Sequence, residues 1–345
     1  MMNAAQYTPG GVENLYVSQV PIPEPGEMEV RVQVYATAIN RADTLQGTED
    51  YENLIVLEVF SKILMLVDKC SCIEIVLSHK HINARVTRGP GCPTNLSKGL
   101  RVMALLTGGG NAEYVICRHE FLIPIPENLD FIKAAAIPEV WLTAFQLLYL
   151  IGKLNKDDVV LIHAGGSGVG TAAIQLVKGA GAVAIATAGN DKKIEYATFL
   201  GADAAINYKT EKIAEKVLHH TNNKGVTLIL DCVGSSMFED NLKSIRLDGR
   251  WVVYGFLGGS QVDTDLRKLL AKRITMTFTT LRSRSVNYKE NLIQEFMQKA
   301  IPLFQNGTFK PVIEQVFPLS DIAKAHSMIE SNQNLGKIIL EVKKE

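Results

Sequence analysis

The chain has 345 residues, of which 47% are hydrophobic and 21% are charged. This composition is typical of a globular protein with a substantial core, and it excludes an intrinsically disordered chain. The 36 basic residues balance the 36 acidic ones. We therefore expect no nucleic-acid partner and no membrane-binding face, because both need clustered Lys and Arg. A chain of this length predicts about two domains.

The cysteines and the N-terminal residues predict a cytoplasmic protein. Five sparse cysteines, an odd number in so long a chain, are not a disulfide framework and indicate a reducing compartment. The opening residues, MMNAAQYTPGG, have no basic region and no apolar run, so we expect no signal peptide. The longest apolar runs, such as ILMLV, are far shorter than the roughly 20 residues that span a bilayer.

The first part of the chain, to about residue 138, has the pattern of short β-strands. Residues 28–40 alternate valines with other residues, which predicts a half-buried strand. Residues 101–117 have the pattern of a strand, a glycine turn and a second strand. Short strands between Gly and Pro residues predict a β-rich, barrel-like unit.

The next part, residues 139–281, alternates β-branched runs with helical patterns. Strands are predicted at residues 157–164, 183–188, 203–208, 226–234, 250–258 and 274–280. Alternation of this kind predicts a parallel sheet that is covered by helices on both faces. From residue 282 the pattern predicts a helix, a strand, a second helix and a final strand.

The strongest motif is VVLIHAGGSGVGTAAIQL, residues 159–176. A buried strand ends in a glycine-rich turn and a helix begins at once, a context that favours dinucleotide binding. Gly165 permits a tight turn and Gly170 lets the helix pack close to the strand, while Ser167 stands where the strict pattern has Gly. The helix N-terminus offers amides and a positive dipole end to a pyrophosphate. The alternative is a structural turn without a ligand, although open parallel sheets usually bind ligands at this crevice.

The end of the second strand of this block indicates which dinucleotide binds. NAD sites usually place an acidic residue there for the ribose hydroxyls, but the strand tip here is Gly189. Lys192 and Lys193 follow, and a lysine suits a 2′-phosphate, so NADPH is favoured over NADH; Asp191 argues the other way. The lysines could also be the solvated start of a helix. Tyr208, at the end of the third strand, could cover the adenine, contact the phosphate or be an ordinary strand-end aromatic.

Six segments along the chain carry a likeness to a known family. They are AINRADTLQ, PIPENLDFIKAAAIPEVWLTAFQLL, VLIHAGGSGVGTAAIQL, GADAAINY, LILDCVG and DGRWVVYGFLGG. In this order they resemble the quinone oxidoreductase branch of the medium-chain dehydrogenase/reductase superfamily. The likeness covers about residues 10–45 and 89–342.

The resemblance implies an α/β fold with a GroES-like β-barrel domain and a Rossmann domain built on a doubly wound parallel sheet. The expected domains are residues 1–138, a GroES-like substrate domain with an atypical segment at 47–88; residues 139–281, the Rossmann NADPH-binding domain; and residues 282–345, a C-terminal return to the substrate domain. It also implies NADPH as hydride donor and a small-molecule quinone or enone as acceptor. Pairing through the Rossmann sheet edges implies a homodimer.

The resemblance further implies site residues, motif by motif. Asn40 and Asp43 match the nicotinamide and substrate cleft, although without the family a turn that caps the strand is the simpler interpretation. Tyr51 is a further candidate for that cleft. The implied cofactor-binding residues are Thr143, Gly165, Gly166, Ser167, Gly168, Val169, Gly170, Lys193, Tyr208, Tyr254, Gly255, Thr280 and Leu281. Among them, Lys193 and Tyr208 match the pair that holds the 2′-phosphate.

A second motif suggests a metal site. Cys70, Cys72, His79 and His81 are the ligand types of structural zinc. Their spacing is unlike the C-x2-4-C and H-x3-5-H pairs of such sites, and a free Cys is commonly a small buried hydrophobe. The zinc-dependent relatives carry a catalytic Cys where this chain has NRAD, residues 40–43, which offers no thiol. We therefore expect no metal and zinc-independent chemistry.

The same region is where the chain leaves the family pattern. After VLEV at residues 56–59 it departs, and it rejoins at GPGC, residues 89–92. Two alternatives to an NADPH:quinone oxidoreductase therefore stay open. One is a zinc-free enoyl or alkenal reductase on the same scaffold, and the other is a cofactor-binding protein whose turnover the atypical segment 47–88 impairs.

Overall fold

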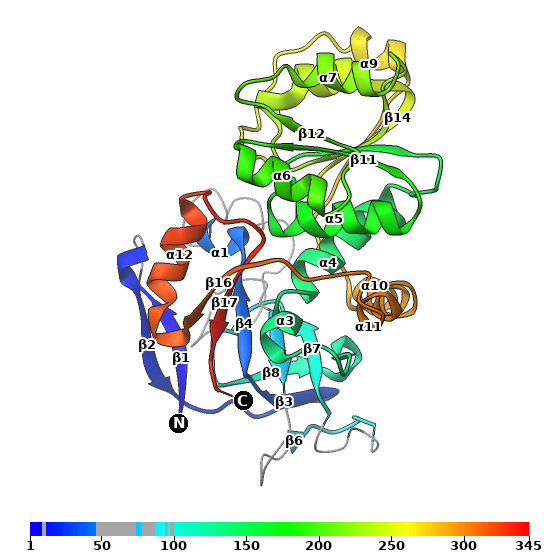
Figure 1. The fold of residues 1–345 in the computed structure, drawn as a ribbon. Coiled ribbons are helices and arrows are strands. Elements are labelled where there is room, and N and C mark those ends of the chain that lie inside the picture. Colours follow the sequence, from blue (N-terminus) through cyan, green and yellow to red (C-terminus); the bar gives the residue numbers. More distant parts are fainter. Residues whose placement is uncertain (9–11, 46–73, 78–86, 94–95, 97–99, 345) are drawn as a thin grey trace. The chain divides into compact units, whose positions relative to one another are not determined.

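The computed structural model describes residues 1–8, 12–45, 74–77, 87–93, 96 and 100–344. The chain forms two compact units, one of Met1–Glu139 with Arg282–Glu345 and one of Val140–Leu281 (Figure 1). The first unit therefore contains both ends of the chain, and the second is one continuous stretch.

The first unit is built mainly from antiparallel sheets. One sheet has the order β16-β17-β4-β5-β7-β9, a second has the order β6-β3-β8, and β1 pairs with β2. The strands are β1 (Met2–Tyr7), β2 (Leu15–Val20), β3 (Glu29–Gln33), β4 (Ala36–Ile39), β5 (Glu74–Leu77), β6 (Thr87–Arg88), β7 (Val102–Leu105), β8 (Tyr114–Arg118), β9 (Ile123–Pro124), β16 (Ile313–Pro318) and β17 (Lys337–Glu341). In the part of the chain described, β16 and β17 are the one parallel pair of this unit.

The last strand of the chain completes the sheet that carries residues 36–40. β17 pairs antiparallel with β4, with Ile338 opposite Ile39. Both side chains are buried, and they belong to an apolar cluster with α12. The helices of this unit are α1 (Arg41–Leu45), α3 (Phe131–Ala135), α10 (Val286–Lys299), α11 (Ile301–Gln305) and α12 (Ile322–Glu330).

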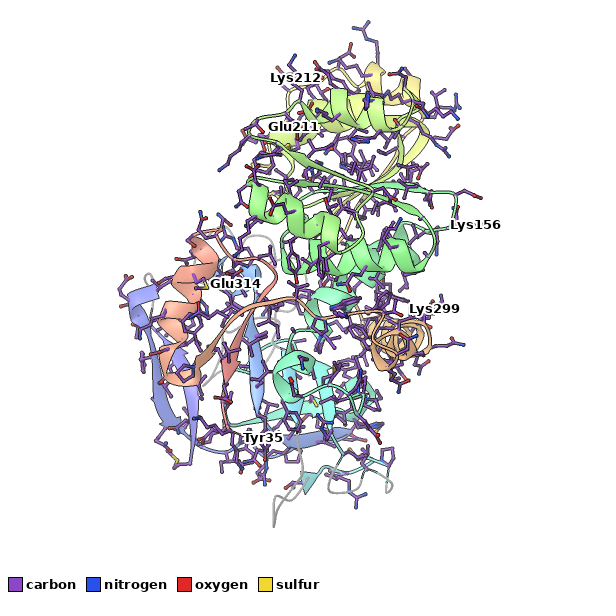
Figure 2. The ribbon with its side chains drawn as sticks, viewed as in Figure 1. Tyr35, Lys156, Glu211, Lys212, Lys299 and Glu314 are labelled. Carbon is purple, nitrogen blue, oxygen red and sulfur yellow. The ribbon has the colours of Figure 1, made fainter. Side chains whose placement is uncertain are left out.

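The single strand predicted over residues 28–40 is wrong, because the chain forms two strands there. β3 pairs with β8, whereas β4 pairs with β17. The change of partner falls at Val34 and Tyr35: the N–H of Val34 donates to the carbonyl oxygen of Glu113 at 2.9 Å, and the carbonyl oxygen of Tyr35, labelled in Figure 2, accepts from the N–H of Val342 at 2.8 Å. Alternation along one segment could not reveal that its two halves have different partners.

The second unit is built on a six-stranded sheet in which the pairings are parallel. Its order is β12-β11-β10-β13-β14-β15. The strands are β10 (Val159–Ile162), β11 (Val183–Ala188), β12 (Ala204–Asn207), β13 (Val226–Asp231), β14 (Ile245–Val253) and β15 (Thr275–Phe278). β11 and β13 lie on the two sides of β10, so the strand order reverses at β10, which is where open parallel sheets bind ligands.

Helices cover both faces of this sheet. They are α5 (Gly168–Gly179), α6 (Asp191–Phe199), α7 (Ile213–His220), α8 (Phe238–Ser244) and α9 (Arg267–Lys272), and α4 (Pro138–Phe145) precedes them. In Figure 1, α5 and α6 lie on one face of the sheet, and α7 and α9 lie on the other. The predicted α/β fold, with a doubly wound parallel sheet and a separate β-rich unit, is confirmed.

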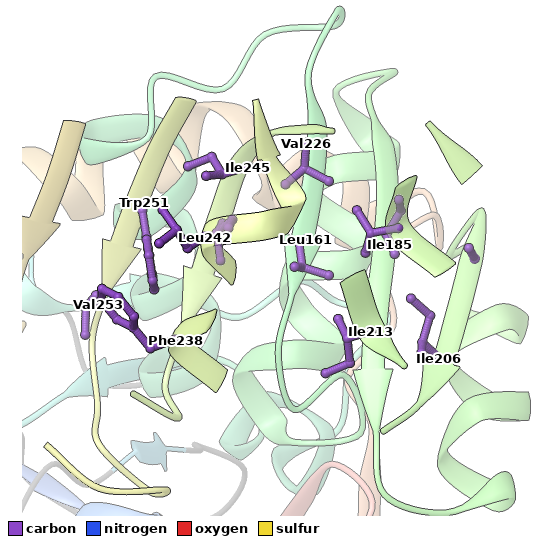
Figure 3. Close-up of a cluster of buried hydrophobic side chains, with 13 residues drawn as sticks. Leu161, Ile185, Ile206, Ile213, Val226, Phe238, Leu242, Ile245, Trp251 and Val253 are labelled. Carbon is purple, nitrogen blue, oxygen red and sulfur yellow. The ribbon is translucent and has the colours of Figure 1, made fainter. Parts of the chain in front are cut away.

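The core beneath α7 and α8 is one apolar cluster (Figure 3). It joins strand residues such as Leu161 and Trp251 to helix residues such as Ile213 and Phe238. The Trp251 side chain is fully buried, and its ring centroid lies 5.0 Å from that of Phe238. This packing fixes the strands and helices against one another, and it leaves the carboxyl ends of the strands to carry the polar residues described next.

Candidate cofactor site

The glycine-rich turn lies between β10 and α5. The N–H of Gly165 donates to the carbonyl oxygen of Thr187 on β11 at 2.8 Å. Ser167 is the N-cap of α5, and its Oγ accepts from the N–H of Gly170 at 3.0 Å. The chain thus enters a 12-residue helix directly after the strand. The first turn of that helix presents backbone amides and a positive dipole end, which suit a phosphate group.

The glycines of this turn are required by close packing. A Cβ at Gly165 would lie 2.8 Å from the Cβ of Ala186, and one at Gly170 would lie 2.2 Å from the carbonyl oxygen of Ala164. Both approaches are closer than real Cβ atoms show. Gly170 therefore lets the start of the helix pack close to the end of the strand, as the sequence predicts, whereas Gly165 is required by its close approach to β11. The turn fits the pyrophosphate of a dinucleotide.

Tyr208 directly follows β12, and Lys193 lies in the first turn of α6, the helix that follows β11. A Cβ at Gly166 would lie 2.8 Å from Cγ and Cδ of Lys193, so the aliphatic part of that lysine lies against the turn. A Cβ at Gly189, the tip of β11, would lie 2.6 Å from the hydroxyl of Tyr208. Tyr208 is 41% exposed. The fold thus places the predicted 2′-phosphate residues beside the turn and the strand tip.

Asp191, the acidic residue that argues against NADPH, is bound by a neighbouring side chain. Its Oδ1 accepts from Nδ2 of Asn207 at 2.8 Å. Asn190 caps the same helix, since its Oδ1 accepts from the N–H of Lys193 at 2.9 Å. Glu211, labelled in Figure 2, accepts from the N–H of Asn207 at 3.0 Å. The Asp191 carboxylate is therefore hydrogen-bonded within the protein, which makes it a weaker candidate for binding the ribose hydroxyls.

Four of the other predicted cofactor residues follow further strands of the same sheet. Tyr254 and Gly255 follow β14, and Thr280 and Leu281 follow β15 shortly after its end. Thr143 lies on α4, just before the π-helical segment Gln146–Ile151, an element that the sequence patterns did not predict. Residues after the carboxyl ends of parallel strands share one edge of the sheet.

The loop after β13 is shaped by a buried carboxylate that the sequence analysis missed. Asp231 is fully buried. Its Oδ1 accepts from the N–H groups of Val233 and Gly234 at 2.7 and 2.9 Å, and its Oδ2 accepts from Nε1 of Trp251 at 3.0 Å. The next loop is tied to this one, because the N–H of Leu257 donates to the carbonyl oxygen of Cys232 at 3.0 Å. The loops after β13 and β14 are therefore held together by a hydrogen bond at the carboxyl ends of the strands.

Cys232, next to this carboxylate, is not a reactive thiol. Burial raises the pKa of Cys232 to about 12, and the nearby Asp231 charge acts in the same direction. A thiol with so high a pKa stays protonated at neutral pH, and the thiolate is the form that attacks electrophiles or binds metals.

In the first unit, Asn40 and Asp43 form a buried turn after β4. The N–H of Asn40 donates to Oδ2 of Asp43 at 2.7 Å, and the N–H of Asp43 donates to the carbonyl oxygen of Asn40 at 3.0 Å. A buried lysine that the sequence analysis missed supports this turn. Nζ of Lys337 donates to the carbonyl oxygen of Ile39 at 2.9 Å and to Oδ1 of Asn40 at 2.5 Å. In the sequence, the position of this lysine at the start of the apolar run KIIL was the signal that it could be buried.

Some predicted residues lie outside the described part of the chain. They are Tyr51 and the four zinc-type residues Cys70, Cys72, His79 and His81. Among the residues that the structure describes, no group of three or more His, Cys, Asp or Glu is arranged to hold a metal ion. No helix in the described ranges is long and apolar enough to cross a membrane.

Comparison with known proteins agrees with this geometry. Residues 168–300 match the family described as zinc-binding dehydrogenase. Quinone oxidoreductase-like protein 2 of Bos taurus is 30% identical over 72% of this chain and 72% of its own length. A 2-haloacrylate reductase of a Burkholderia species is 28% identical over 99% of this chain and 98% of its own. The Escherichia coli quinone oxidoreductase, solved in complex with NADPH, has a TM-score of 0.83 and 25% identity, over 99% of this chain and 100% of that one.

A parallel sheet with a glycine turn at its switch point, joined to an antiparallel unit, defines a medium-chain dehydrogenase/reductase. Within that superfamily the chain belongs to the quinone oxidoreductase family. The predicted family is therefore confirmed, and the protein is an oxidoreductase.

Proposed function

We propose that this protein is an NADPH-dependent reductase of quinones that works without zinc. The observation that carries the cofactor assignment is the strand tip at Gly189, where Tyr208 and the nearby Lys193 take the place of a ribose-binding carboxylate. The Escherichia coli relative was solved with NADPH, which supports the same cofactor. Binding NADPH through a 2′-phosphate needs positive charge at this point, and a lysine supplies it.

Each part of the candidate site has a role in this proposal. The bound NADPH supplies the hydride, the difficult part of the chemistry. The amides at the start of α5 bind the pyrophosphate, and Lys193 and Tyr208 bind the 2′-phosphate. Thr143, Tyr254, Gly255, Thr280 and Leu281 orient the cofactor. Asn40 and Asp43 orient the acceptor, whose reduction depends mainly on correct placement against the nicotinamide.

The proposed independence from zinc rests on the donor set around Asn40. Residues 40–43 are Asn, Arg, Ala and Asp, which supply no thiolate and no imidazole. The ammonium group of Lys337 lies 2.5 Å from Oδ1 of Asn40. A fixed positive charge at this oxygen opposes the binding of a divalent cation there.

The experiment that tests the function is NADPH oxidation against a small panel of acceptors: an ortho-quinone, a para-quinone and an enone. We expect oxidation with at least one quinone and a higher kcat/KM for quinones than for the enone. Activity that survives exhaustive treatment with a zinc chelator is expected as well. A preference for the enone would instead favour the reductase alternative, which the similarity to 2-haloacrylate reductase supports.

NADPH binding with no oxidation by any acceptor would contradict the enzymatic proposal. It would favour a cofactor-binding protein with impaired turnover. Quenching of protein fluorescence by NADPH, measured in the same samples, separates this result from a failure to bind the cofactor at all.

The proposed oligomer is a homodimer that pairs through the edge of the parallel sheet. β15 is the last strand in the described sheet order. Several large apolar side chains near it are exposed, including Phe278 at 60%, Leu266 at 70% and Leu270 at 76%. The rings of Phe256 and Phe278 stack with centroids 6.4 Å apart. An exposed apolar edge of this kind is typical of a surface that a partner covers. The cytoplasmic location stays a prediction.

A further inference from the structure

A chain of buried polar side chains runs beneath the cofactor turn. His163 immediately precedes Ala164 of the turn, and its ring is fully buried. Its Nδ1 lies 2.9 Å from Oγ1 of Thr187, and its Nε2 lies 2.6 Å from Oδ1 of Asn241. Nδ2 of Asn241 donates in turn to Oδ2 of Asp231 at 3.1 Å. The chain thus passes from β11 through β10 and α8 to β13.

The carboxylate at one end fixes the direction of these hydrogen bonds. Asp231 accepts from Asn241, so the amide of Asn241 must turn its oxygen toward His163. Nε2 of His163 is then the donor to that oxygen. In the neutral imidazole, Nδ1 is left as an acceptor, and the hydroxyl of Thr187 can donate to it. The donor and the acceptor of each hydrogen bond from Thr187 to Asp231 are therefore fixed, and an apolar replacement of any of the four side chains leaves a buried partner unsatisfied.

Thr187 and Asp231, at the two ends of this hydrogen-bonded series, support the glycine turn and the loop after β13, which lie on the two sides of the proposed cofactor site. The backbone of Thr187 accepts from the N–H of Gly165, so the residue that holds His163 also holds the glycine turn. Asp231 accepts from the N–H groups of Val233 and Gly234, so it shapes the loop after β13. A shift of His163 would therefore disturb both the glycine turn and the loop after β13.

We infer that the chain Thr187–His163–Asn241–Asp231 is a positioning device for the cofactor, which sets the glycine turn in register with the loop after β13. The inference rests on the proposed function, because it assumes that this edge binds NADPH. Preorganised amides bind a phosphate more tightly than mobile ones, since no ordering has to occur on binding.

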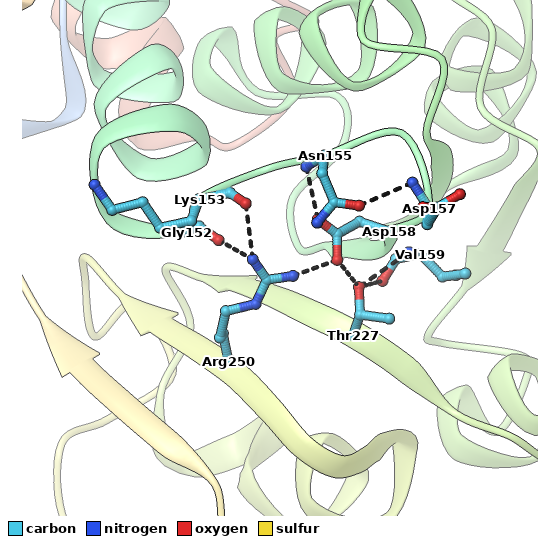
Figure 4. Close-up of polar contacts among 8 residues, drawn as sticks. All are labelled: Gly152, Lys153, Asn155, Asp157, Asp158, Val159, Thr227 and Arg250. Carbon is cyan, nitrogen blue, oxygen red and sulfur yellow. Dashed lines mark hydrogen bonds and ion pairs between the residues drawn. The ribbon is translucent and has the colours of Figure 1, made fainter.

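The same sheet contains a second buried polar network that serves as an internal control. Near the amino ends of β10 and β13, Oγ1 of Thr227 donates to Oδ1 of Asp158 at 2.6 Å, and Arg250 contacts the same carboxylate (Figure 4). Thr187 is 1% exposed and Thr227 is 2% exposed. The two threonines are thus matched in burial and in bonding to a polar side chain, but they lie at opposite ends of their strands.

The test compares Thr187→Val with Thr227→Val. Each substitution removes a hydroxyl group and keeps the shape of the side chain, near the carboxyl end of β11 for Thr187 and near the amino end of β13 for Thr227. The first readout is amide hydrogen exchange without cofactor. We expect Thr187→Val to raise exchange roughly tenfold in residues 164–170, whereas Thr227→Val raises it only around residues 155–159. Because this exchange is measured without NADPH, it tests whether Thr187 supports the glycine turn even if the protein does not bind the cofactor.

The second readout is the dissociation constant for NADPH. We expect Thr187→Val to weaken binding several-fold and Thr227→Val to leave it unchanged, with both variants less stable than the parent. Equal effects of the two variants on turn exchange, or no effect of either, would overturn the inference. If the parent protein binds NADPH but both variants bind equally well, the inference also fails while the proposed function stands.

Two substitutions of His163 add a test of the hydrogen bonds themselves. His163→Gln keeps a donor and an acceptor at similar reach, whereas His163→Leu has neither. We expect His163→Gln to recover part of the NADPH affinity and turn protection that His163→Leu loses. Equal losses in the two variants would contradict the role of these bonds, and if His163→Leu does not fold, the threonine pair still decides the question.

Discussion

At the scale of single residues, the candidate site depends on small contacts at the strand ends. Gly166 and Gly189 matter because a side chain at either would collide with Lys193 or Tyr208. Asp191 matters because its contact with Asn207 gives it a structural partner. The residues of each contacting pair lie well apart along the chain, and the fold decided which of them touch.

The first prediction concerns the 2′-phosphate. Replacing Lys193 with Ala should weaken NADPH binding about tenfold or more, because it removes a charged donor to the phosphate. NADH, which lacks that phosphate, should bind the variant as it binds the parent. Fluorescence titration with both cofactors measures the two constants. Lys192→Ala, at the adjacent exposed lysine, is the control and should change NADPH binding far less; equal effects of the two variants would refute the assignment.

The second prediction concerns the lysine beneath the Asn40 turn. Lys337→Met keeps a chain of similar length but removes the donors to Ile39 and Asn40. We expect kcat/KM for the acceptor to fall about tenfold to a hundredfold, since the turn loses its support. The dissociation constant for NADPH should change far less, because the glycine turn and the proposed 2′-phosphate residues lie in the other unit.

Lys343→Met, the same substitution at an exposed lysine, is the control for that variant. Lys343 lies just after β17 with its Nζ 5.2 Å from the ring centroid of Tyr35, away from the turn. Steady-state kinetics on both variants, with melting curves beside them, separate positioning from stability. A Lys337 variant with a lower melting temperature but unchanged kcat/KM would show that this lysine has only a structural role.

At the scale of secondary-structure elements, the two units differ in how far the sequence predicted them. The strands and helices of the parallel sheet could be predicted from local patterns, because the central strands β10, β11 and β13 are short, almost wholly buried apolar runs that alternate with helical patterns. Residues 28–40 were misjudged because two strands with different partners follow one another without a turn signal. The π-helical segment was missed because no simple period marks such a segment.

The third prediction concerns the start of α5. Ser167→Ala removes the hydroxyl that caps the helix, at a cost of about 1 kcal/mol in the free energy of unfolding. It should also weaken NADPH binding, because the cap fixes the first turn of α5, whose amides are proposed to hold the pyrophosphate. Ser285→Ala is the control, since Ser285 caps α10 in the first unit by accepting from the N–H of Tyr288.

Both serine variants are expected to lose similar stability in urea unfolding, but only the Ser167 variant should lose affinity for NADPH. Unchanged cofactor affinity in Ser167→Ala would count against the proposed position of the pyrophosphate.

At the scale of the whole molecule, the chain leaves one unit at about residue 140 and returns to it at about residue 282. β17 then pairs with β4, so residues nearly three hundred positions apart form one sheet. The roles of substrate domain and NADPH-binding domain that the family implies are proposals for these two units. The proposed homodimer also concerns the whole molecule.

The fourth prediction concerns that dimer. Leu270→Glu places a charge on the exposed apolar surface near β15 and should convert the dimer to monomers, because burying an unpaired charge at an interface is costly. Light scattering coupled to size-exclusion chromatography measures the mass. Phe199→Glu, at a residue 74% exposed on α6, is the control and should leave the dimer intact. A parent protein that is monomeric at micromolar concentration would refute the proposal.

The sequence by itself determined the local features of this protein: the alternating strands and helices, the glycine turn and the absence of a carboxylate at Gly189. These depend on neighbours within a few residues, and the physical rules for them are local. Only the tertiary structure decided the contacts between distant residues, such as Lys337 with Asn40, Asn207 with Asp191 and His163 with Asn241. Such contacts join buried polar groups that must find partners once water is excluded, and the identity of the partner follows from how strands and helices pack.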